Sequence, residues 1–184
     1  MSSLVIEKKI TVAEFLKMDF EEGFLYELIN GIIVKRASPS AEHQNIVSNL
    51  NTEFNNFIKP LKIGKCYPAP LDVYLTNTDL TQPDLIYVSK DRAHIVKGFI
   101  EGVPDLLVEI LSPGTAKTDR GTKRSLYERC GVAEYWIIDP KSQSIEIYIL
   151  ENGHYELYSF AQESGEVESK VLVGFKLSIE ELFH

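Results

Sequence analysis

The chain has 184 residues, 44% of them hydrophobic, and its 27 acidic against 19 basic residues give a net charge of −8. This length supports one well-buried core, so we expect a single domain over residues 1–184, and the negative charge argues against non-specific binding of polyanions, although a groove can be locally basic in an acidic protein. No apolar run is long enough to span a membrane and no signal-peptide pattern opens the chain, so we expect a cytoplasmic protein.

The first elements expected along the chain are a short helix and a β-hairpin. Residues 11–18 begin with a threonine cap followed by Glu14 at the third helical position, an arrangement that satisfies free amide groups at a helix start. Asn30 and Gly31 separate two apolar runs, and this dipeptide favours the two positive φ angles of a tight hairpin turn. We therefore expect a β-hairpin over residues 25–36.

A long helix is expected from Ser40 to about Ile58. Its apolar residues recur at steps of three and four, Ser40 fits the N-cap position, and Pro60 is expected just past the end. His43 lies on the same inward stripe as the apolar residues. A histidine in such a place is more often a hydrogen-bonded core residue than a ligand, and both interpretations stay open here.

Three β-rich runs follow this helix: LDVYL (71–75), PDLIYVS (83–89) and PDLLVEIL (104–111). The last run is almost continuously apolar, as in a strand that is covered on both faces. We expect all three runs to form central strands of a mixed sheet.

The second half of the chain predicts a strand, helix, strand unit and another hairpin. After the strand of residues 104–111, a helix is expected over about 117–130 and a further strand over 134–139. A second Asn-Gly pair at 152–153 predicts another hairpin, and residues 178–183 predict a closing helical turn. Together the elements predict an α/β (α+β) fold of three layers, with a central mixed β-sheet flanked by helices and additional β-hairpins.

Two carboxylates interrupt the apolar strands and need a partner. Glu109 is set within the apolar run 104–111, and burying an ionised carboxylate costs several kcal/mol unless it is paired or binds a metal. Asp84 directly follows Pro83 at the start of another apolar run, which places its carboxylate at a strand end. Both residues are therefore candidates for a functional site.

Lys123 is the third candidate. The inward stripe of the helix over 117–130 has residues at steps of three and four: Asp119, Lys123, Leu126, Tyr127 and Cys130. Lys123 therefore points inward, close enough to the helix start to reach the C-terminal end of the strand that carries Glu109. Two alternatives stay open: an exposed i, i+4 pair with Asp119, worth only about 0.3 to 0.5 kcal/mol, and a buried ion pair with Glu109 that binds no metal.

Two carboxylates and one ammonium group suit the hydrolysis of a phosphodiester bond. Carboxylate oxygens hold Mg²⁺ or Mn²⁺, which polarises the phosphate and lowers the pKa of a bound water. The ammonium group stabilises negative charge in the transition state or orients the nucleophile. We expect Asp84 and Glu109 to bind the metal and Lys123 to assist the reaction.

The same residues belong to a longer pattern, which consists of Gln82-Pro83-Asp84, Val108-Glu109-Ile110-Leu111-Ser112-Pro113, Asp119, Lys123, Tyr127 and Gly131-Val132-x-Glu134-Tyr135-Trp136-x-x-Asp139-Pro140. This pattern resembles the Uma-two (Uma2) family of restriction-endonuclease-like proteins within the PD-(D/E)XK nuclease superfamily. The resemblance extends from about Tyr26 through Asp139, and the GVxEYW stretch is specific to the family. It implies a restriction-endonuclease-like fold and a Mg²⁺-dependent endonuclease that cuts DNA, expected as a homodimer because two sites are needed to cut both strands.

By this resemblance, Asp84 fills the aspartate position of the superfamily motif and Glu109 the acidic position of its second half. Leu111 stands where the motif has a lysine, so the lysine role would pass to Lys123 on the following helix. The family pattern also points to Glu27 and His43 as auxiliary acidic and polar positions. For Glu27 the alternative is a cross-strand pair within the first hairpin.

A second hypothesis belongs to a different class of function. The chain is then a catalytically inactive module that keeps the nuclease fold for binding or assembly. Leu111 and the net charge of −8 favour it. Three convergent ionisable groups on otherwise apolar elements oppose it, because such groups cost stability unless they are used, and the nuclease hypothesis stays ahead.

Overall fold

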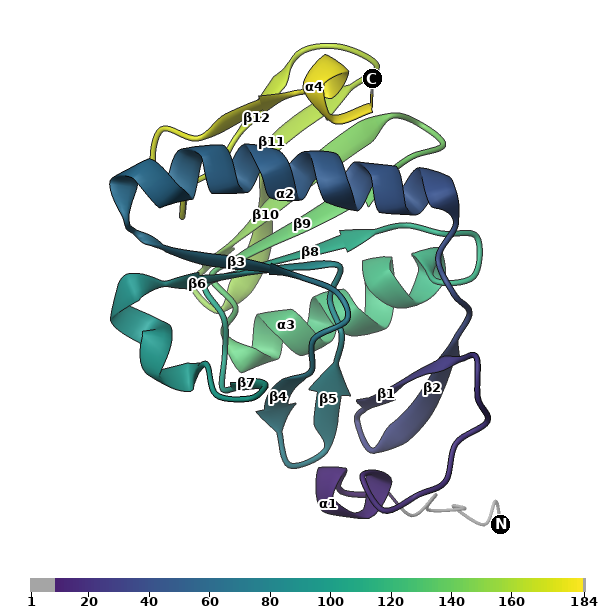
Figure 1. Ribbon diagram of the computed structural model, residues 1–184. Coiled ribbons are helices and arrows are strands. Elements are labelled where there is room, and N and C mark those ends of the chain that lie inside the picture. Colours follow the sequence, from purple (N-terminus) through teal and green to yellow (C-terminus); the bar gives the residue numbers. More distant parts are fainter. Residues whose placement is uncertain (1–8, 184) are drawn as a thin grey trace.

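The computed structural model describes residues 9–183 and shows a mixed α/β fold (Figure 1). The strands are β1 (Leu25–Ile29), β2 (Ile32–Arg36), β3 (Gly64–Pro68), β4 (Val73–Thr76), β5 (Asp79–Thr81), β6 (Leu85–Ser89), β7 (Ile100–Glu101), β8 (Leu106–Ile110), β9 (Glu134–Asp139), β10 (Ser144–Glu151), β11 (His154–Gln162), β12 (Glu166–Glu168) and β13 (Lys176–Ser178). The helical elements are α1 (Val12–Phe15), α2 (Ala41–Leu61), η1 (Lys90–Ile95), η2 (Thr118–Lys123), α3 (Arg124–Cys130) and α4 (Ile179–Phe183). One mixed sheet has the order β11-β10-β9-β8-β6-β3 and another the order β2-β1-β5-β4-β7, while β12 pairs with β13.

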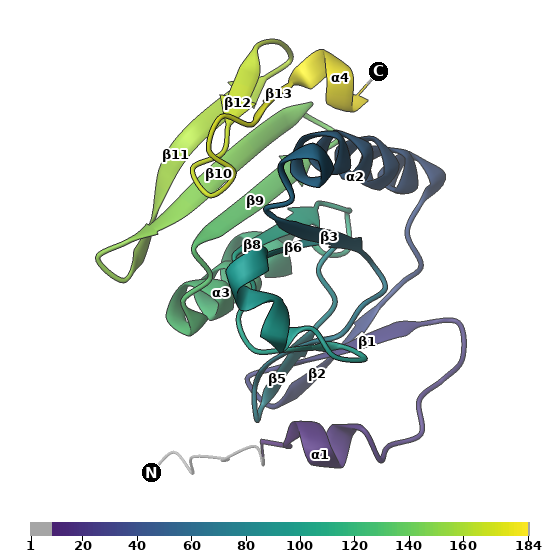
Figure 2. The same ribbon diagram turned by 60° about the vertical axis from the view of Figure 1, so that its left-hand side comes forward.

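Helices cover both faces of the six-stranded sheet. α2 lies across one face, and α3 lies against the other (Figures 1 and 2). Alternate side chains of β8 enter the two cores, with Leu106, Val108 and Ile110 on the α2 side and Leu107 on the α3 side. The prediction that this strand is covered on both faces is confirmed. No helix of residues 9–183 combines the length and the apolar character that a membrane crossing requires.

The first helix and the first hairpin form where the sequence predicts them. The backbone N–H of Thr11 donates to Glu14 Oε2 at 2.8 Å, and the N–H of Glu14 donates to Thr11 Oγ1 at 3.2 Å, which is the expected capping box. The helix is shorter than the predicted 11–18. β1 and β2 form the hairpin, with φ angles of 56° at Asn30 and 75° at Gly31.

α2 begins as predicted but ends later. Ser40 is its N-cap and accepts a hydrogen bond from the N–H of His43 at 3.2 Å. The expectation that Pro60 follows the helix is wrong, because Pro60 lies inside the last turn. The helix ends instead at Lys62, which adopts the left-handed conformation with φ 53°.

The three β-rich runs do not share one sheet. β6 and β8 are antiparallel neighbours in the six-stranded sheet, as expected for central strands. The run 71–75 contributes β4, which lies in the five-stranded sheet, so its expected place is wrong. The physical reason is that β4 and the strand after it, β5, pair across a tight turn and then find partners distant in the chain, β7 beside β4 and β1 beside β5.

The predicted strand, helix, strand unit is confirmed. β8 and β9 are parallel, with Glu109 opposite Ile137, and the helix between them ends at Gly131, whose φ is 83°. The first part of this helix, η2, is a π-helix rather than an α-helix. The second predicted hairpin and the closing helical turn are also present, as β10–β11 and α4.

The carboxylate of Glu134 ties the C-terminal segment to the six-stranded sheet. Glu134 is fully buried at the start of β9. Its oxygens accept hydrogen bonds from Trp136 Nε1 at 2.6 Å, Ser169 Oγ at 2.7 Å and the N–H groups of Lys170 and Val171, both at 2.8 Å. Removal of this carboxylate leaves several donors without an acceptor in a buried place, which is costly.

Glu134→Ala is expected to lower the free energy of unfolding by about 3 kcal/mol or more, since hydrogen bonds to a charged group contribute roughly 1.5 to 3 kcal/mol each. Urea denaturation followed by the fluorescence of Trp136, the only tryptophan, measures the change. Glu151→Ala is the control, because Glu151 pairs with Lys170 on the surface and its loss should cost under about 1 kcal/mol. Equal losses in the two variants would contradict the anchoring role of Glu134.

Candidate active site

Two carboxylates lie at one end of the strand pair β6–β8. Leu85 stands opposite Val108 in this pair, Asp84 precedes Leu85 and Glu109 follows Val108. Asp84 and Glu109 are 4% and 0% exposed. Because the two strands are antiparallel, Asp84 and Glu109 come next to the paired residues Leu85 and Val108 on the same side of that pair along the strands. The structure therefore brings together the two predicted metal ligands.

Glu109 is held by two donors from the helix that follows its strand. Its Oε1 atom accepts hydrogen bonds from Lys123 Nζ at 2.8 Å and from Tyr127 Oη at 2.7 Å. Its Oε2 atom is 3.9 Å from Nη2 of Arg36 and, within residues 9–183, accepts no hydrogen bond. One carboxylate oxygen of Glu109 thus accepts two hydrogen bonds, whereas the other has only the longer ion-pair contact with Arg36.

Lys123 lies at the centre of a buried charged cluster. Its ammonium group is 2.8 Å from Glu109 Oε1 and 2.9 Å from Glu27 Oε1. Asp119, the i, i+4 partner that the sequence offered as an alternative, is more distant at 3.8 Å. Lys123 is fully buried, so the alternative of an exposed surface pair with Asp119 is wrong.

Glu27 joins the five-stranded sheet to this cluster. It lies on β1, is fully buried, and its Oε1 atom accepts a hydrogen bond from the N–H of Gln82 at 2.7 Å. Arg36 Nη1 donates to the same oxygen at 3.3 Å, across the hairpin from β2. Glu27 therefore forms a cross-strand contact within the first hairpin, and it also contacts Lys123.

Asp84 and His43 form a separate contact beside the cluster. Asp84 Oδ2 accepts a hydrogen bond from the N–H of Ile110 at 2.7 Å and lies 3.2 Å from His43 Nε2. Burial raises the pKa of Asp84, but the contacts with His43, the charge of Arg36 and the Ile110 amide outweigh it, so the pKa lies below 3.8. The contacts with Ile110 and His43 therefore favour the ionised carboxylate and fix its position.

Burial opposes the ionisation of Glu109 and Asp119, and nearby cations compensate this effect only in part. Burial raises the pKa of Glu109 more than Lys123 lowers it, and the same holds for Asp119. Burial alone would lower the pKa of Lys123, but the charges of Glu109 and Glu27 raise it by more than burial lowers it. The ammonium group therefore keeps its proton. The same carboxylates raise the pKa of Arg36.

The charged cluster has more negative than positive groups. Together with Asp84 beside it, the cluster has four carboxylates, Glu27, Asp84, Glu109 and Asp119, against two cationic side chains, Arg36 and Lys123. If all are ionised, four minus two leaves two negative charges, which a divalent cation would neutralise. Oxygen-rich sites of this kind suit Mg²⁺ or Mn²⁺ rather than softer metals.

The donor set fits such an ion without forming a complete cage. Within residues 9–183, no group of three or more His, Cys, Asp or Glu side chains is arranged to hold a metal ion. Mg²⁺ is usually bound by one or two carboxylates, with waters and substrate phosphates at its other positions. Glu27 Oε2 and Glu109 Oε2 are among the buried oxygens that accept no hydrogen bond from any described residue. A site of one or two carboxylates is therefore compatible with the structure.

A cavity of about 690 Å³ gives access to this place. Its wall includes Arg36, His43, Gln82, Asp84 and Thr115. Glu109 and Lys123 are not among the residues that line it, and both are fully buried behind this wall. A ligand in the cavity therefore meets Asp84 first.

All five candidate residues from the sequence lie in this part of the molecule, but they form two separate groups of contacts. Lys123 pairs with Glu109 and Glu27, whereas His43 contacts Asp84. Three residues that were not among the candidates also contact the site: Arg36, Asp119 and Tyr127. Asp119 and Tyr127 were visible on the inward stripe of the helix. No local signal marks Arg36, which stands at the end of a hairpin strand like an ordinary surface cation.

Comparison with known proteins identifies a family and a similar crystal structure. Residues 12–180 match the Uma2 family, which is described as "Putative restriction endonuclease". A crystal structure described as "a putative nuclease belonging to DUF820 from Anabaena variabilis ATCC 29413" has a TM-score of 0.77 with this chain. The two chains are 26% identical, and the match covers 95% of this chain and 97% of that one.

Two curated relatives come from Synechocystis sp. (strain ATCC 27184 / PCC 6803 / Kazusa). "Uncharacterized protein slr1290" is 29% identical over 144 residues, which cover 76% of this chain and 74% of the relative. "Uncharacterized protein sll1609" is 24% identical over 155 residues, which cover 80% of this chain and 85% of the relative.

The raised pKa of Glu109 predicts a pH-dependent stability. In metal-free buffer, the free energy of unfolding should fall as pH rises above the ordinary carboxyl pKa of 4.5, because the folded protein keeps the Glu109 proton that the unfolded chain has already released. The slope due to this one group is at most about 1.4 kcal/mol per pH unit. Urea denaturation at a series of pH values measures it.

Glu109→Gln should remove this part of the pH dependence, because glutamine does not titrate. Glu151→Gln, at an exposed position, should keep the slope of the unaltered protein. A Glu109→Gln variant with an unchanged slope would show that the pKa of Glu109 is not raised in the folded state.

Proposed function

This chain belongs to the Uma2 family, and from that premise we propose that it is a metal-dependent nuclease that hydrolyses phosphodiester bonds of DNA. The proposed ligands of Mg²⁺ or Mn²⁺ are Asp84 and Glu109, and the proposed cationic partner is Lys123. The proposal includes a restriction-endonuclease-like arrangement of three layers, in which the six-stranded sheet lies between α2 and α3.

The observation that carries this proposal is the buried contact between Lys123 Nζ and Glu109 Oε1 at 2.8 Å. A buried ion pair is seldom better for stability than apolar residues of the same volume. This pair lies near Asp84, which itself lines an open cavity, and the pair leaves Glu109 Oε2 without a hydrogen bond from residues 9–183. Perturbed ionisable groups next to a cavity support a functional use.

Each side chain of the site has a different role in the proposed reaction. When bound, Mg²⁺ supplies positive charge that stabilises the negative charge developing on the phosphate and makes a nearby water more acidic. Lys123 and Tyr127 orient Glu109 by holding one oxygen and leaving the other free. His43, 3.2 Å from Asp84, orients that carboxylate toward the cavity wall. The ammonium group of Lys123 adds fixed positive charge that needs no rearrangement.

Leu111 occupies the motif position of the lysine for a structural reason. Its side chain is 6% exposed in the core on the α3 side, and its N–H donates to the carbonyl oxygen of Ile138 at 2.8 Å. The positive charge comes instead from Lys123, the last residue of the π-helix η2. Short π-helical segments occur frequently at functional sites, which supports the transfer of this role to the helix.

We propose a homodimer as the active form, because cutting both strands of a duplex requires two sites. β11 ends the six-stranded sheet and exposes large apolar side chains, among them Leu157 and Phe160. An exposed apolar edge strand is a place where a second chain pairs. Light scattering should give about twice the chain mass of 20.9 kDa, and Leu157→Lys should reduce it to one chain, whereas an unaltered protein of one-chain mass would contradict the dimer.

One observation favours the second candidate, an inactive module that keeps this fold. Glu109 Oε1 is already satisfied by Lys123 and Tyr127, so the cluster is held together without a metal. In that case the cavity serves to bind a partner and no bond is cut. The two candidates differ in one measurable property, the metal-dependent cleavage of DNA.

Asp84→Asn, Glu109→Gln and Lys123→Met are each expected to reduce the cleavage of plasmid DNA by roughly 100-fold or more, the loss seen when one preorganised electrostatic group is removed from an active site. These substitutions preserve the size of the side chain, so they disturb packing little. Conversion of supercoiled plasmid to nicked and linear forms, with Mg²⁺, Mn²⁺ or EDTA, measures the activity.

Asp105→Asn and Lys117→Met are the matched controls. Asp105 lies just before β8, at the end remote from Glu109, and Lys117 is an exposed residue just before η2. Both controls should cleave like the unaltered protein, and an equal loss in them would contradict the assignment of the site. Thermal stabilisation by Mg²⁺ without any cleavage would instead support the inactive module.

A further inference from the structure

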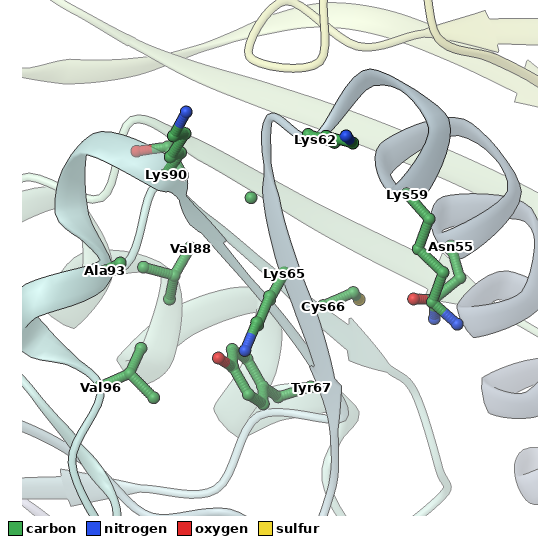
Figure 3. A pocket seen from close by; sticks show the side chains of 12 residues that line it. Asn55, Lys59, Lys62, Lys65, Cys66, Tyr67, Val88, Lys90, Ala93 and Val96 are labelled. Carbon is green, nitrogen blue, oxygen red and sulfur yellow. The ribbon is translucent and has the colours of Figure 1, made fainter.

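A second cavity, of about 780 Å³, contains a concentration of positive charge. Lys59 and Lys62 line it from the C-terminal end of α2, Lys65 from β3 and Lys90 from the start of η1 (Figure 3). Its wall contains no Asp or Glu from the part of the chain that the structure describes. The charge of this cavity wall is thus opposite in sign to that of the whole chain, whose net charge is −8.

The charges of these four lysines are available to a ligand. Each side chain is exposed, and none forms an ion pair with another residue of the range 9–183. Some other surface lysines are paired, for example Lys170 with Glu151 at 2.6 Å and Lys35 with Glu21 at 2.6 Å. Lys17 and Lys141 are likewise exposed and form no ion pair with residues 9–183, so what distinguishes the four lysines is that they line one cavity.

The backbone around the cavity is fixed by close packing. A Cβ atom at Gly64 would lie 2.4 Å from the carbonyl oxygen of Val88, so glycine is required for β3 to approach β6 this closely. The N–H of Lys90 donates to the carbonyl oxygen of Ile63 at 2.8 Å, which joins the start of η1 to the residue before β3. The lysines thus extend from rigid elements rather than from a loose loop.

A polar stripe along α2 connects this cavity to the candidate active site. The stripe follows steps of three and four and consists of Gln44, Ser48, Asn51, Asn55, Lys59 and Lys62. Gln44 lines the cavity that contains Asp84, and Asn55 lines the lysine cavity. Both acidic residues of the helix, Glu42 and Glu53, stand two positions before a member of the stripe, which puts them on the opposite side.

We propose that the polar stripe and the lysine cavity bind the sugar-phosphate backbone of a nucleic-acid strand whose reacting phosphate lies at Asp84. The proposal rests on the function proposed above and names how that substrate is held. Lysines bind phosphate oxygens through charge, and amide and hydroxyl groups donate hydrogen bonds to them without reading sequence.

The spacing of the two cavities fits a polymer rather than a small anion. Ala69 lines the cavity of Asp84, and Lys65 lines the lysine cavity four residues away on the same extended segment. Four residues of strand span about 13 Å, which corresponds to about four nucleotide steps of roughly 3.4 Å each. A strand that starts at Asp84 therefore reaches the lysines within a few nucleotides.

Replacement of all four lysines by glutamine tests the proposal. Fluorescence anisotropy measures the binding of a short labelled oligonucleotide, single-stranded or duplex, in EDTA so that no cleavage occurs. The variant Lys59→Gln/Lys62→Gln/Lys65→Gln/Lys90→Gln should bind at least about 10-fold more weakly, and the slope of log K against log salt should shrink by about 3 to 4, since each lost phosphate contact removes roughly 0.7 to 0.9.

The control removes the same charge elsewhere on the surface: Lys17, Lys141, Lys170 and Lys176, each replaced by glutamine. This variant should bind like the unaltered protein, and thermal melting confirms that both variants are folded. Equal weakening in the two variants, or none in the first, would overturn the proposal. A lysine-dependent affinity for inorganic phosphate as high as for the oligonucleotide would also overturn it, because it indicates a site for one small anion.

Asp84→Asn distinguishes this inference from the proposed function. It should abolish cleavage in Mg²⁺ and keep the lysine-dependent binding in EDTA. Lysine-dependent binding by a protein that never cleaves DNA would contradict the nuclease proposal but support the proposed binding by the polar stripe and the lysine cavity. Cleavage by a protein whose DNA binding does not depend on the lysines would support the nuclease proposal and contradict the proposed binding by the lysine cavity.

Discussion

The burial of Glu109 against Lys123 is the constraint on which this end of the molecule depends. A carboxylate in a strand covered on both faces must be neutralised locally, because water does not reach it. The helix after β8 meets this need only if its inward stripe carries a cation near its start. The π-helical turn that ends at Lys123 places the ammonium group 2.8 Å from Glu109. The identity of residue 123 is thus tied to that of residue 109 by charge.

The same lysine also joins the two sheets. Glu27 belongs to the five-stranded sheet and Glu109 to the six-stranded sheet, and both carboxylates share the ammonium group of Lys123. Arg36 repeats the pattern, with Glu27 at 3.3 Å and Glu109 at 3.9 Å. Because both cations are shared, neither sheet completes the cluster alone. The first hairpin is therefore part of the candidate site and not only a cover at the edge of the fold.

The sequence predicts those features whose cause is local. The Thr11 cap, the Asn30 turn and the start of α2 depend on neighbouring residues, and each is present. The Glu109–Lys123 contact was predictable because alternation in a strand and periodicity in a helix both point inward from adjacent elements. The sheet of β4 and the position of Arg36 were not, because partners distant in the chain decide both.

The net charge of this protein is a poor guide to where an anion binds, because salt screens the interaction between charges that are far apart. At physiological salt the Debye length is about 8 Å, so a phosphate beside Lys59 or Lys65 responds mainly to charges within that distance. The acidic residues of α2 lie on the far side of the helix, and the cavity wall described here contains none. The carboxylate of Asp84 lies beyond the polar stripe. An excess of acidic residues elsewhere therefore does not prevent the lysine cavity from attracting an anionic strand, and the repulsion between that strand and Asp84 is limited to the place where a bound cation would cancel it.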